Sequence, residues 1–247
     1  MIDLLSCGAF SFAKDHFRQN EDAFLLPKSS GNGYLFAIAD GVGSYAGANE
    51  AAQTAINSLS AIEYPGFLEP ELVLNNIKNK LTEAAEKKPD EAKAATTLSY
   101  CFINSDYVYV VHVGDTRIYA RKGLKLQLLT KDHTQHQELL DDGLYTRKEL
   151  KSLPGKNKLT AAISKRLPVH YQFLKIPLDE LADEDGALML VIMSDGAHSF
   201  WEHRPRFSVT TMNNANNFAA NMHKRIRRLG PDDDHSLIAA SFKRILV

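Results

Sequence analysis

The chain has 247 residues, which is long enough to bury one sizeable core, and a second domain is allowed but not required. The formal net charge of −1 creates no global field that would attract nucleic acid or an anionic membrane. No apolar run approaches the roughly 20 residues that cross a bilayer, and the N-terminal segment lacks the basic and apolar parts of a signal peptide. We therefore expect a cytoplasmic protein that binds neither nucleic acid nor membrane.

Taken in chain order, strand patterns outnumber helix patterns. Apolar runs bounded by turn residues predict strands over 3–10, 22–26, 33–39, 95–103, 107–113, 116–121, 125–129, 159–163, 169–176, 187–194 and 236–242. Helical spacing predicts helices that begin after Ser44 as an N-cap, run from near Leu68 to Pro89, and cover 134–153 and 213–229. Because the turns within 95–129 are short, we expect its four strands to form one antiparallel meander.

About ten short strands with three or four helices, and no regular alternation of the two, favour the α+β class. We expect an αββα sandwich, in which two antiparallel sheets pack face to face and amphipathic helices cover the outer faces. Neither a linker nor a repeat divides residues 1–247, so we expect one domain. Cys7 and Cys101 lie in apolar runs without metal-site spacing, which predicts buried free thiols in a reducing compartment.

The stretch AIADGVGSYAGANEAA, residues 37–52, places three glycines between a predicted strand and a predicted helix. Such an arrangement is typical of a phosphate-binding loop. However, Gly41, Gly43 and Gly47 are spaced one residue too widely for the dinucleotide fingerprint, and no Gly-Lys-Ser/Thr follows. Asp40 ends the strand instead, and an Asp-Gly pair can offer a carboxylate and a carbonyl oxygen to one cation. We therefore interpret the stretch as part of a cation site.

A second strand pattern, LMLVIM, is followed by the same pair at Asp195-Gly196. Further carboxylates stand at the ends of predicted strands, namely Glu21, Asp22, Asp115, Asp132, Asp232, Asp233 and Asp234. Carboxylates without a cluster of His or Cys favour Mg²⁺ or Mn²⁺ over zinc. Several converging carboxylates can hold two ions about 3.5–4 Å apart, as in two-metal hydrolysis of phosphate esters. The residues alone therefore predict a metal-dependent hydrolase.

Seven segments in order resemble motifs of the metal-dependent protein serine/threonine phosphatases of the PP2C type. These segments are NEDAF, AIADGVGSYAGANEAA, ATTLSYCFI, VYVVHVGDTRIYARKGLKLQLLTKDHT, LTAAI, LMLVIMSDGAHSF and DDDHSLIAASF. The resemblance extends over about 230 residues, in the bacterial-like single-domain form. It implies the same sandwich of two antiparallel sheets with helices outside.

The resemblance implies roles for individual residues. Asp40 would bridge two Mn²⁺ or Mg²⁺ ions, and the Gly41 carbonyl with Glu21 or Asp22 would complete one of them. Asp195 and Asp233 would hold the other ion. Asp132 matches the position of a weaker third ion, whereas Asp115 is expected to order the hairpin or to support the ligands from behind.

Three positions depart from the family pattern. The family places a phosphate-binding arginine where this chain has Phe17, and the adjacent Arg18 could serve after a one-residue bulge, with His16 as a second candidate. Ser199 stands where the family often has another aspartate. Asp234 replaces the family's terminal asparagine and is expected to contact water or metal.

The implied reaction is hydrolysis of phosphoserine or phosphothreonine in a protein, in which two ions activate the attacking water. We expect a monomer that opposes a Ser/Thr kinase. His133 and His198 are candidates for a general acid, whereas the histidines lack the spacing of a zinc site. Two alternatives stay open: a catalytically weak or inactive PP2C-like regulatory binding module, and a two-metal phosphohydrolase for small molecules.

Overall fold

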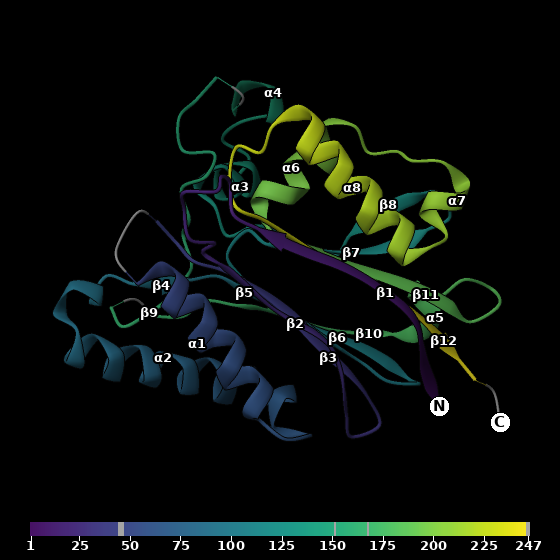
Figure 1. Ribbon diagram of the computed structural model, residues 1–247, viewed down its shortest axis with the longest axis horizontal. Coiled ribbons are helices and arrows are strands. Elements are labelled where there is room, and N and C mark those ends of the chain that lie inside the picture. Colours follow the sequence, from purple (N-terminus) through teal and green to yellow (C-terminus); the bar gives the residue numbers. More distant parts are fainter. Residues whose placement is uncertain (44–46, 151, 167, 246–247) are drawn as a thin grey trace.

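The computed structural model describes residues 1–43, 47–150, 152–166 and 168–245. Two five-stranded antiparallel sheets pack face to face (Figure 1). Sheet A contains, in spatial order, β1 (Ile2–Phe12), β12 (His235–Arg244), β11 (Ala187–Met193), β7 (Arg117–Lys122) and β8 (Lys125–Leu128). Sheet B contains β10 (Gln172–Pro177), β6 (Tyr107–Val113), β5 (Leu98–Ile103), β3 (Gly33–Asp40) and β2 (Asp22–Ser30). The short strands β4 (Ala95–Thr96) and β9 (Ile163–Ser164) form a separate pair.

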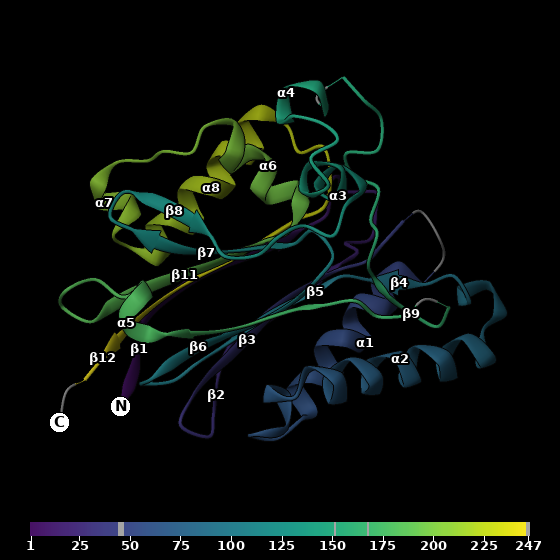
Figure 2. The same ribbon diagram turned by 180° about the vertical axis from the view of Figure 1, so that it is seen from behind.

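Helices cover the outer face of each sheet, so the predicted αββα sandwich is confirmed. α1 (Ala48–Ala61) and α2 (Pro70–Lys87) lie on sheet B, and α6 (Asp195–His203), α7 (Val209–Met212) and α8 (Ala215–Leu229) lie on sheet A (Figure 1). The short helices α3 (Gln135–Asp141) and α4 (Arg147–Leu150) lie at one end of the sandwich, whereas α5 (Leu178–Leu181) follows β10 (Figure 2). The 3₁₀ turns η1 (Gly66–Leu68) and η2 (Pro89–Glu91) flank α2.

The alternation of side chains along the central strands builds the layers, because successive residues of a strand point to opposite faces. In β11, Met189, Val191 and Met193 pack toward the helices on sheet A. Leu190 and Ile192 from the same strand pack between the two sheets. Buried apolar residues on both faces explain why LMLVIM reads as one continuous apolar run.

The expected meander over 95–129 is wrong. β5 pairs with β6 in sheet B, but β7 pairs with β8 and β11 in sheet A, so the chain crosses between sheets after Val113. The crossing uses Gly114 with φ of 106°, a left-handed conformation that favours glycine. Hairpin periodicity alone does not tell which sheet the next strand joins. The crossing matters because it carries Asp115 and Thr116.

Several element boundaries also differ from the predictions. The polar segment 134–153 contains two short helices rather than one, and the predicted strand over 159–163 is a strand only from Ile163. α6, which begins at Asp195 itself, was not predicted. The predicted N-cap Ser44 lies outside the described residues, and the residue before α1 is Gly47.

The two cysteines and the lengths of the helices can be compared with the expectations from composition. Cys7 and Cys101 are both free thiols, as predicted, but only Cys101 is fully buried. Among the described helices, none is both long enough and apolar enough to span a membrane.

Candidate metal centre

The first half of the site lies where β2 begins and β3 ends. Asp22 and Asp40 are direct partners across these two strands. The Asp40 backbone is fixed by Thr97, whose Oγ1 accepts from the Asp40 N–H at 3.0 Å and whose N–H donates to the Asp40 carbonyl at 2.8 Å. The Gly41 N–H donates to the Glu21 carbonyl at 3.1 Å. Hydrogen bonds with Thr97, between β4 and β5, and with Glu21, just before β2, therefore set the position of Asp40 and Gly41.

Gly41 cannot be exchanged for a larger residue without a backbone shift. A Cβ at this position would lie 2.5 Å from the carbonyl oxygen of Ala48 and 2.9 Å from that of Glu21. The start of α1 thus packs directly against the Asp-Gly turn. This close approach accounts for one glycine of the 37–52 stretch without any bound phosphate.

The second half of the site lies where β11 ends and α6 begins. Ser194 joins the two halves, because its Oγ donates to Asp22 Oδ2 at 2.9 Å and accepts from the Ser236 N–H at 2.9 Å. Gly196 follows Asp195, and a Cβ there would lie only 2.0 Å from the Asp234 carbonyl oxygen. The first turn of α6 therefore packs tightly on the segment that carries Asp233.

Asp234 has a structural role that sequence reasoning missed. Its Oδ1 accepts from the Lys14 N–H at 2.7 Å, and its Oδ2 accepts from the Glu21 N–H at 2.6 Å. Both carboxylate oxygens thus hold the segment between β1 and β2 against the start of β12. The expected contact of Asp234 with water or metal is not what the structure shows for these two atoms.

Carboxylates from both halves line one cavity of about 290 Å³. Its acidic residues are Glu21, Asp40, Asp115, Asp195, Asp233 and Asp234, and Gly41 lines it as well. Asp22 is 4% exposed and lies behind this lining. The structure therefore brings together the residues assigned to the two ions, with Asp22 behind Asp40.

A larger cavity of about 640 Å³ adjoins the first. The two share Asp115, Asn157, Asp195 and Asp233 in their linings. Asp132 lines the larger cavity, apart from Asp40. Ser199, which stands at the family's aspartate position, also lines it and has a buried hydroxyl without a hydrogen-bond partner among the described residues.

Burial raises the pKa of the central carboxyl groups. The pKa of Asp40 lies well above its usual value because the group is buried and because Asp22 and Asp195 are close. Burial also raises the pKa of Asp22 to about 7 and that of Asp195 to about 6. For Asp115, burial and the nearby Asp195 raise the pKa to about 8. The protein itself supplies too little positive charge to stabilise these groups as anions.

The donor set fits a hard cation. Buried carboxylate oxygens are ligands that Mg²⁺ and Mn²⁺ prefer, and Asp22 Oδ1 is buried without a hydrogen-bond partner among the described residues. Within the described ranges, however, no three Asp, Glu, His or Cys side chains already converge as one ligand set. The carboxylates of the described residues thus line the cavity without forming a ready-made ligand set.

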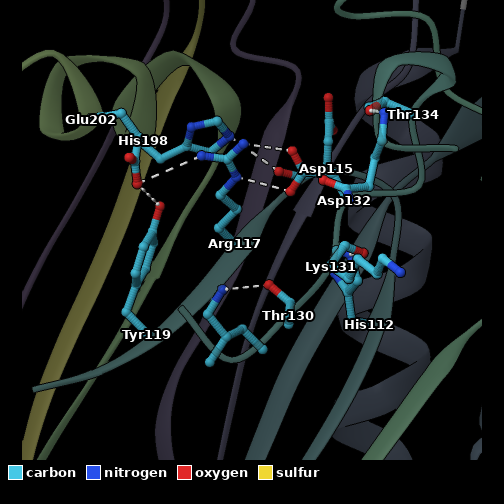
Figure 3. Close-up of polar contacts among 12 residues, drawn as sticks. His112, Asp115, Arg117, Tyr119, Thr130, Lys131, Asp132, Thr134, His198 and Glu202 are labelled. Carbon is cyan, nitrogen blue, oxygen red and sulfur yellow. Dashed lines mark hydrogen bonds and ion pairs between the residues drawn. The ribbon is translucent and has the colours of Figure 1, made fainter. Parts of the chain in front are cut away.

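Asp132 is engaged by an arginine that sequence reasoning gave no role. Arg117 donates from Nε to Asp132 Oδ1 at 2.8 Å and from Nη2 to Oδ2 at 2.6 Å. Figure 3 shows the guanidinium between Asp132 and Glu202, whose Oε1 lies 3.6 Å from Arg117 Nη1. Arg117 lies two residues after Asp115 in VGDTR, so this motif could have indicated that an arginine lies near the site. A third ion at Asp132 would have to compete with this bidentate pair.

Of the two candidate general acids, His198 lines the larger cavity and His133 does not. His198 is buried, its Nε2 lies 3.2 Å from the Asp115 carbonyl oxygen, and burial lowers its pKa to about 3. His133 Nδ1 accepts from the Gly114 N–H at 3.0 Å, and the described linings of the two cavities do not include it. Both imidazoles therefore stabilise the crossing between the sheets.

Arg18 lies at the cavity with Asp40, and its Nη2 is 3.7 Å from Glu21 Oε2. Phe17 is completely exposed, and neither it nor His16 lines the cavity. Of the two candidates for the phosphate-binding position, Arg18 is thus the one that lines the cavity with Asp40.

The family assignment rests on comparison with known proteins. A family model described as protein phosphatase 2C matches residues 14–240. The chain therefore belongs to the protein phosphatase 2C family. The serine/threonine protein phosphatase PstP of Mycobacterium tuberculosis (strain CDC 1551 / Oshkosh) is 29% identical over 135 residues, which are 53% of this chain and 26% of that protein. The chain thus matches only about a quarter of the length of this relative.

Solved structures support the same fold. The crystal structure of the Mycobacterium tuberculosis phosphatase PstP/Ppp superposes with a TM-score of 0.76 at 25% identity, covering 96% of this chain and 98% of that one. The catalytic domain of PstP in complex with two manganese ions gives a TM-score of 0.74 at 21% identity, with 98% and 100% coverage. The latter similarity shows the fold alone.

Proposed function

We propose that the chain is a metal-dependent phosphoprotein phosphatase that hydrolyses phosphoserine and phosphothreonine. The single observation that carries this proposal is the cavity in which Asp40 meets Asp195 and Asp233, from opposite halves of a PP2C-family sandwich. The curated relative is named a serine/threonine protein phosphatase, which supports the same substrate class.

We propose Mn²⁺ or Mg²⁺ as the cofactor, in two copies, as in the manganese complex of the PstP catalytic domain. When bound, such ions activate water and neutralise phosphoryl oxygens. Asp40, Asp195 and Asp233 would hold the ions, with the Gly41 carbonyl and Glu21 at the rim of the cavity. Asp22 stays a candidate ligand through Oδ1, and Asp132 stays the candidate for a third ion if Arg117 releases it.

The residues around the carboxylates have supporting tasks in this proposal. Ser194 and Thr97 orient Asp22 and Asp40 through hydrogen bonds. Arg18 would bind the phosphate of the substrate, because an exposed guanidinium beside the cavity can donate two hydrogen bonds to it. Burial excludes water from the rear of the carboxylates and so strengthens their attraction for cations.

We also propose that residues 1–247 act as one monomeric domain in the cytoplasm. Pairing of β1 with β12 joins the two ends of the chain in one sheet and supports a single unit. Free thiols at Cys7 and Cys101 support a reducing compartment. A phosphoprotein substrate implies an opposing Ser/Thr kinase as functional partner.

Hydrolysis assays test this function. We expect the protein to release phosphate from a phosphothreonine peptide and from an aryl phosphate with Mn²⁺ or Mg²⁺, and to lose this activity in excess chelator. Turnover that persists in chelator would contradict the metal mechanism. Folded, cation-loaded protein that hydrolyses neither compound would instead favour the regulatory binding module.

Exchange of Arg18 for alanine is expected to raise KM for the phosphothreonine peptide about tenfold, with a smaller change in kcat. The reason is the loss of a charge-assisted contact to the substrate phosphate, worth roughly 1.5 kcal/mol at an exposed position. Phe17→Ala is the matched control, since Phe17 is exposed and does not line the cavity. Equal KM values for the Arg18→Ala and wild-type proteins would show that Arg18 does not bind the phosphate.

A further inference from the structure

A third cavity, apart from the two that the carboxylates line, lies between α8 and the segment that follows α6. Its volume is about 440 Å³, which is within the range of small-ligand sites. Five of the described residues that line it are basic, namely Arg204, Arg206, Lys224, Arg225 and Arg228, and none is acidic. We refer to this site as the basic cavity. The helices that frame it lie on the outer face of sheet A (Figure 1).

Arg225 is the buried member of the basic cavity and holds the backbone of one of its walls. It is 7% exposed and donates from Nη1 to the Arg204 carbonyl at 2.7 Å and from Nη2 to the Arg206 carbonyl at 2.9 Å. Its guanidinium also stacks on the Phe207 ring, with the central carbon 4.0 Å from the ring centroid. Arg225 therefore holds the backbone that presents Arg204 and Arg206, and we regard it as a positioning residue.

α8 contributes the opposite wall through helical spacing. Asn221, Lys224, Arg225 and Arg228 occupy positions i, i+3, i+4 and i+7, which lie on one face of a helix. Cations in the last turn of a helix also complement its dipole, which accounts for Arg227 and Arg228. The dipole does not account for Arg204 and Arg206, which approach from a different segment.

The positive charge of the basic cavity is not neutralised by the protein. Arg117, Arg121 and Arg244 each form an ion pair with a carboxylate. By contrast, the ion pairs found among the described residues include none of the five basic residues of the cavity. Burial lowers the pKa of Arg225, and the neighbouring Arg204 and Arg228 lower it further. A bound anion would relieve this repulsion.

We propose that the basic cavity is a second binding site, which takes a phosphate group. Guanidinium groups from two segments can donate paired hydrogen bonds to phosphate oxygens, and a dianion matches the local excess of positive charge. The phosphate can come from free inorganic phosphate or from a phosphorylated residue of a polypeptide. α6 separates the basic cavity from Asp195 by about 13 Å of helix. The inference does not depend on the proposed hydrolysis.

Backbone NMR of the Mg²⁺-loaded protein of residues 1–247 can observe the two sites separately. Inorganic phosphate, titrated to about 10 mM, is expected to shift the amide signals of 204–208 and 221–228 in a saturable way. Signals of Gly41 and Gly196 report phosphate at the carboxylate cavity in the same spectra. If the signals of 204–208 and 221–228 do not move while the protein stays folded, the proposal is wrong.

Single-residue variants identify the ligands. Arg204→Ala and Arg228→Ala are each expected to weaken phosphate binding at the basic cavity about fivefold, and Arg228→Glu to abolish it. Arg227→Ala is the control, because Arg227 has the same charge on the same helix but does not line the cavity. If Arg227→Ala weakens binding as much as Arg228→Ala does, only net charge matters and no built site exists.

A peptide comparison distinguishes the two sources of phosphate. The phosphothreonine peptide is titrated into the Asp40→Asn protein, which is not expected to hydrolyse it. Tighter binding of this peptide than of inorganic phosphate at the basic cavity would assign the site to a phosphorylated polypeptide. Equal or weaker binding would assign it to the free ion. Aryl phosphate hydrolysis by the Arg204→Ala and Arg228→Ala proteins should equal that of the wild type, so failure of the basic cavity and failure of the proposed function are separate results.

Discussion

Replacement of Asp40 by asparagine is expected to lower kcat/KM for a phosphothreonine peptide by about a thousandfold or more. Asp40 lies at the end of β3 and lines the cavity together with Asp195 and Asp233, and we propose that its carboxylate contacts both ions. An amide removes the charge and leaves only one oxygen acceptor, which weakens cation binding and the charge stabilisation that depends on it. Asp106→Asn, the same chemical change in an exposed turn, should leave turnover unaltered.

The same substitution should stabilise the protein when cations are removed. Burial and the negative neighbours Asp22 and Asp195 raise the pKa of Asp40 in the folded state. The folded protein therefore retains a proton that the unfolded chain releases, so stability falls as the pH rises above the unfolded pKa near 4. The asparagine side chain of the Asp40→Asn protein cannot titrate, so the variant escapes this loss.

Thermal unfolding in chelator at pH 8 measures the effect. The Asp40→Asn protein should have a higher Tm than the wild type. In a chain of this size, each kcal/mol of added unfolding free energy raises the Tm by about 2–4 °C. At pH values below 4 the difference should shrink, because the carboxyl group is then protonated in both states. A lower Tm for Asp40→Asn at pH 8 would mean that the protein already compensates the Asp40 charge.

Exchange of Gly196 for alanine is expected to destabilise the protein by about 2 kcal/mol or more and to remove most of its activity. Helix propensity alone predicts that this substitution stabilises the protein, since alanine is favoured over glycine in a helix by up to about 1 kcal/mol. The contact decides the sign, because the added Cβ would lie 2.0 Å from the Asp234 carbonyl oxygen, which belongs to the backbone. The first turn of α6 would have to move away from Asp233.

Gly66→Ala is the matched control for this substitution. A Cβ at Gly66 would meet side-chain methyl groups alone, those of Ile62 at 2.9 Å and Leu72 at 3.6 Å, and a methyl group can move. We expect a small change in Tm and normal turnover for Gly66→Ala. If Gly196→Ala melts at or above the wild-type temperature and keeps its activity, the tight packing of α6 on the Asp233 segment is not required.

The layers of the fold were predictable because they depend on local periodicity. β3 and β11 are buried on both faces, and their continuous apolar runs, bounded by turn residues, can each be read within one strand. The crossing after Val113 was missed because the choice between sheets depends on contacts far away in sequence. α6 was missed because it is short and directly follows a strongly apolar strand.

The candidate site, like the fold, was predictable where its residues form a local sequence pattern and not where they meet across the chain. Asp40 and Asp195 were evident from two Asp-Gly pairs at strand ends, and the cavity brings both together. The bidentate pair of Arg117 with Asp132 and the two hydrogen bonds accepted by Asp234 were not evident. Asp234 binds the N–H groups of Lys14 and Glu21, more than 200 positions earlier in the chain, and no local pattern encodes such contacts.

Anomalous scattering from crystals grown with Mn²⁺ tests the central claim most directly, because it locates the ions without assuming any reaction. We predict two manganese peaks about 3.5–4 Å apart in the cavity lined by Asp40, Asp195 and Asp233. The Asp40→Asn protein, crystallised in the same way, should lose at least one of them. Ordered crystals of the wild-type protein with no manganese in this cavity would contradict the assignment of Asp40 as the centre of a two-metal site.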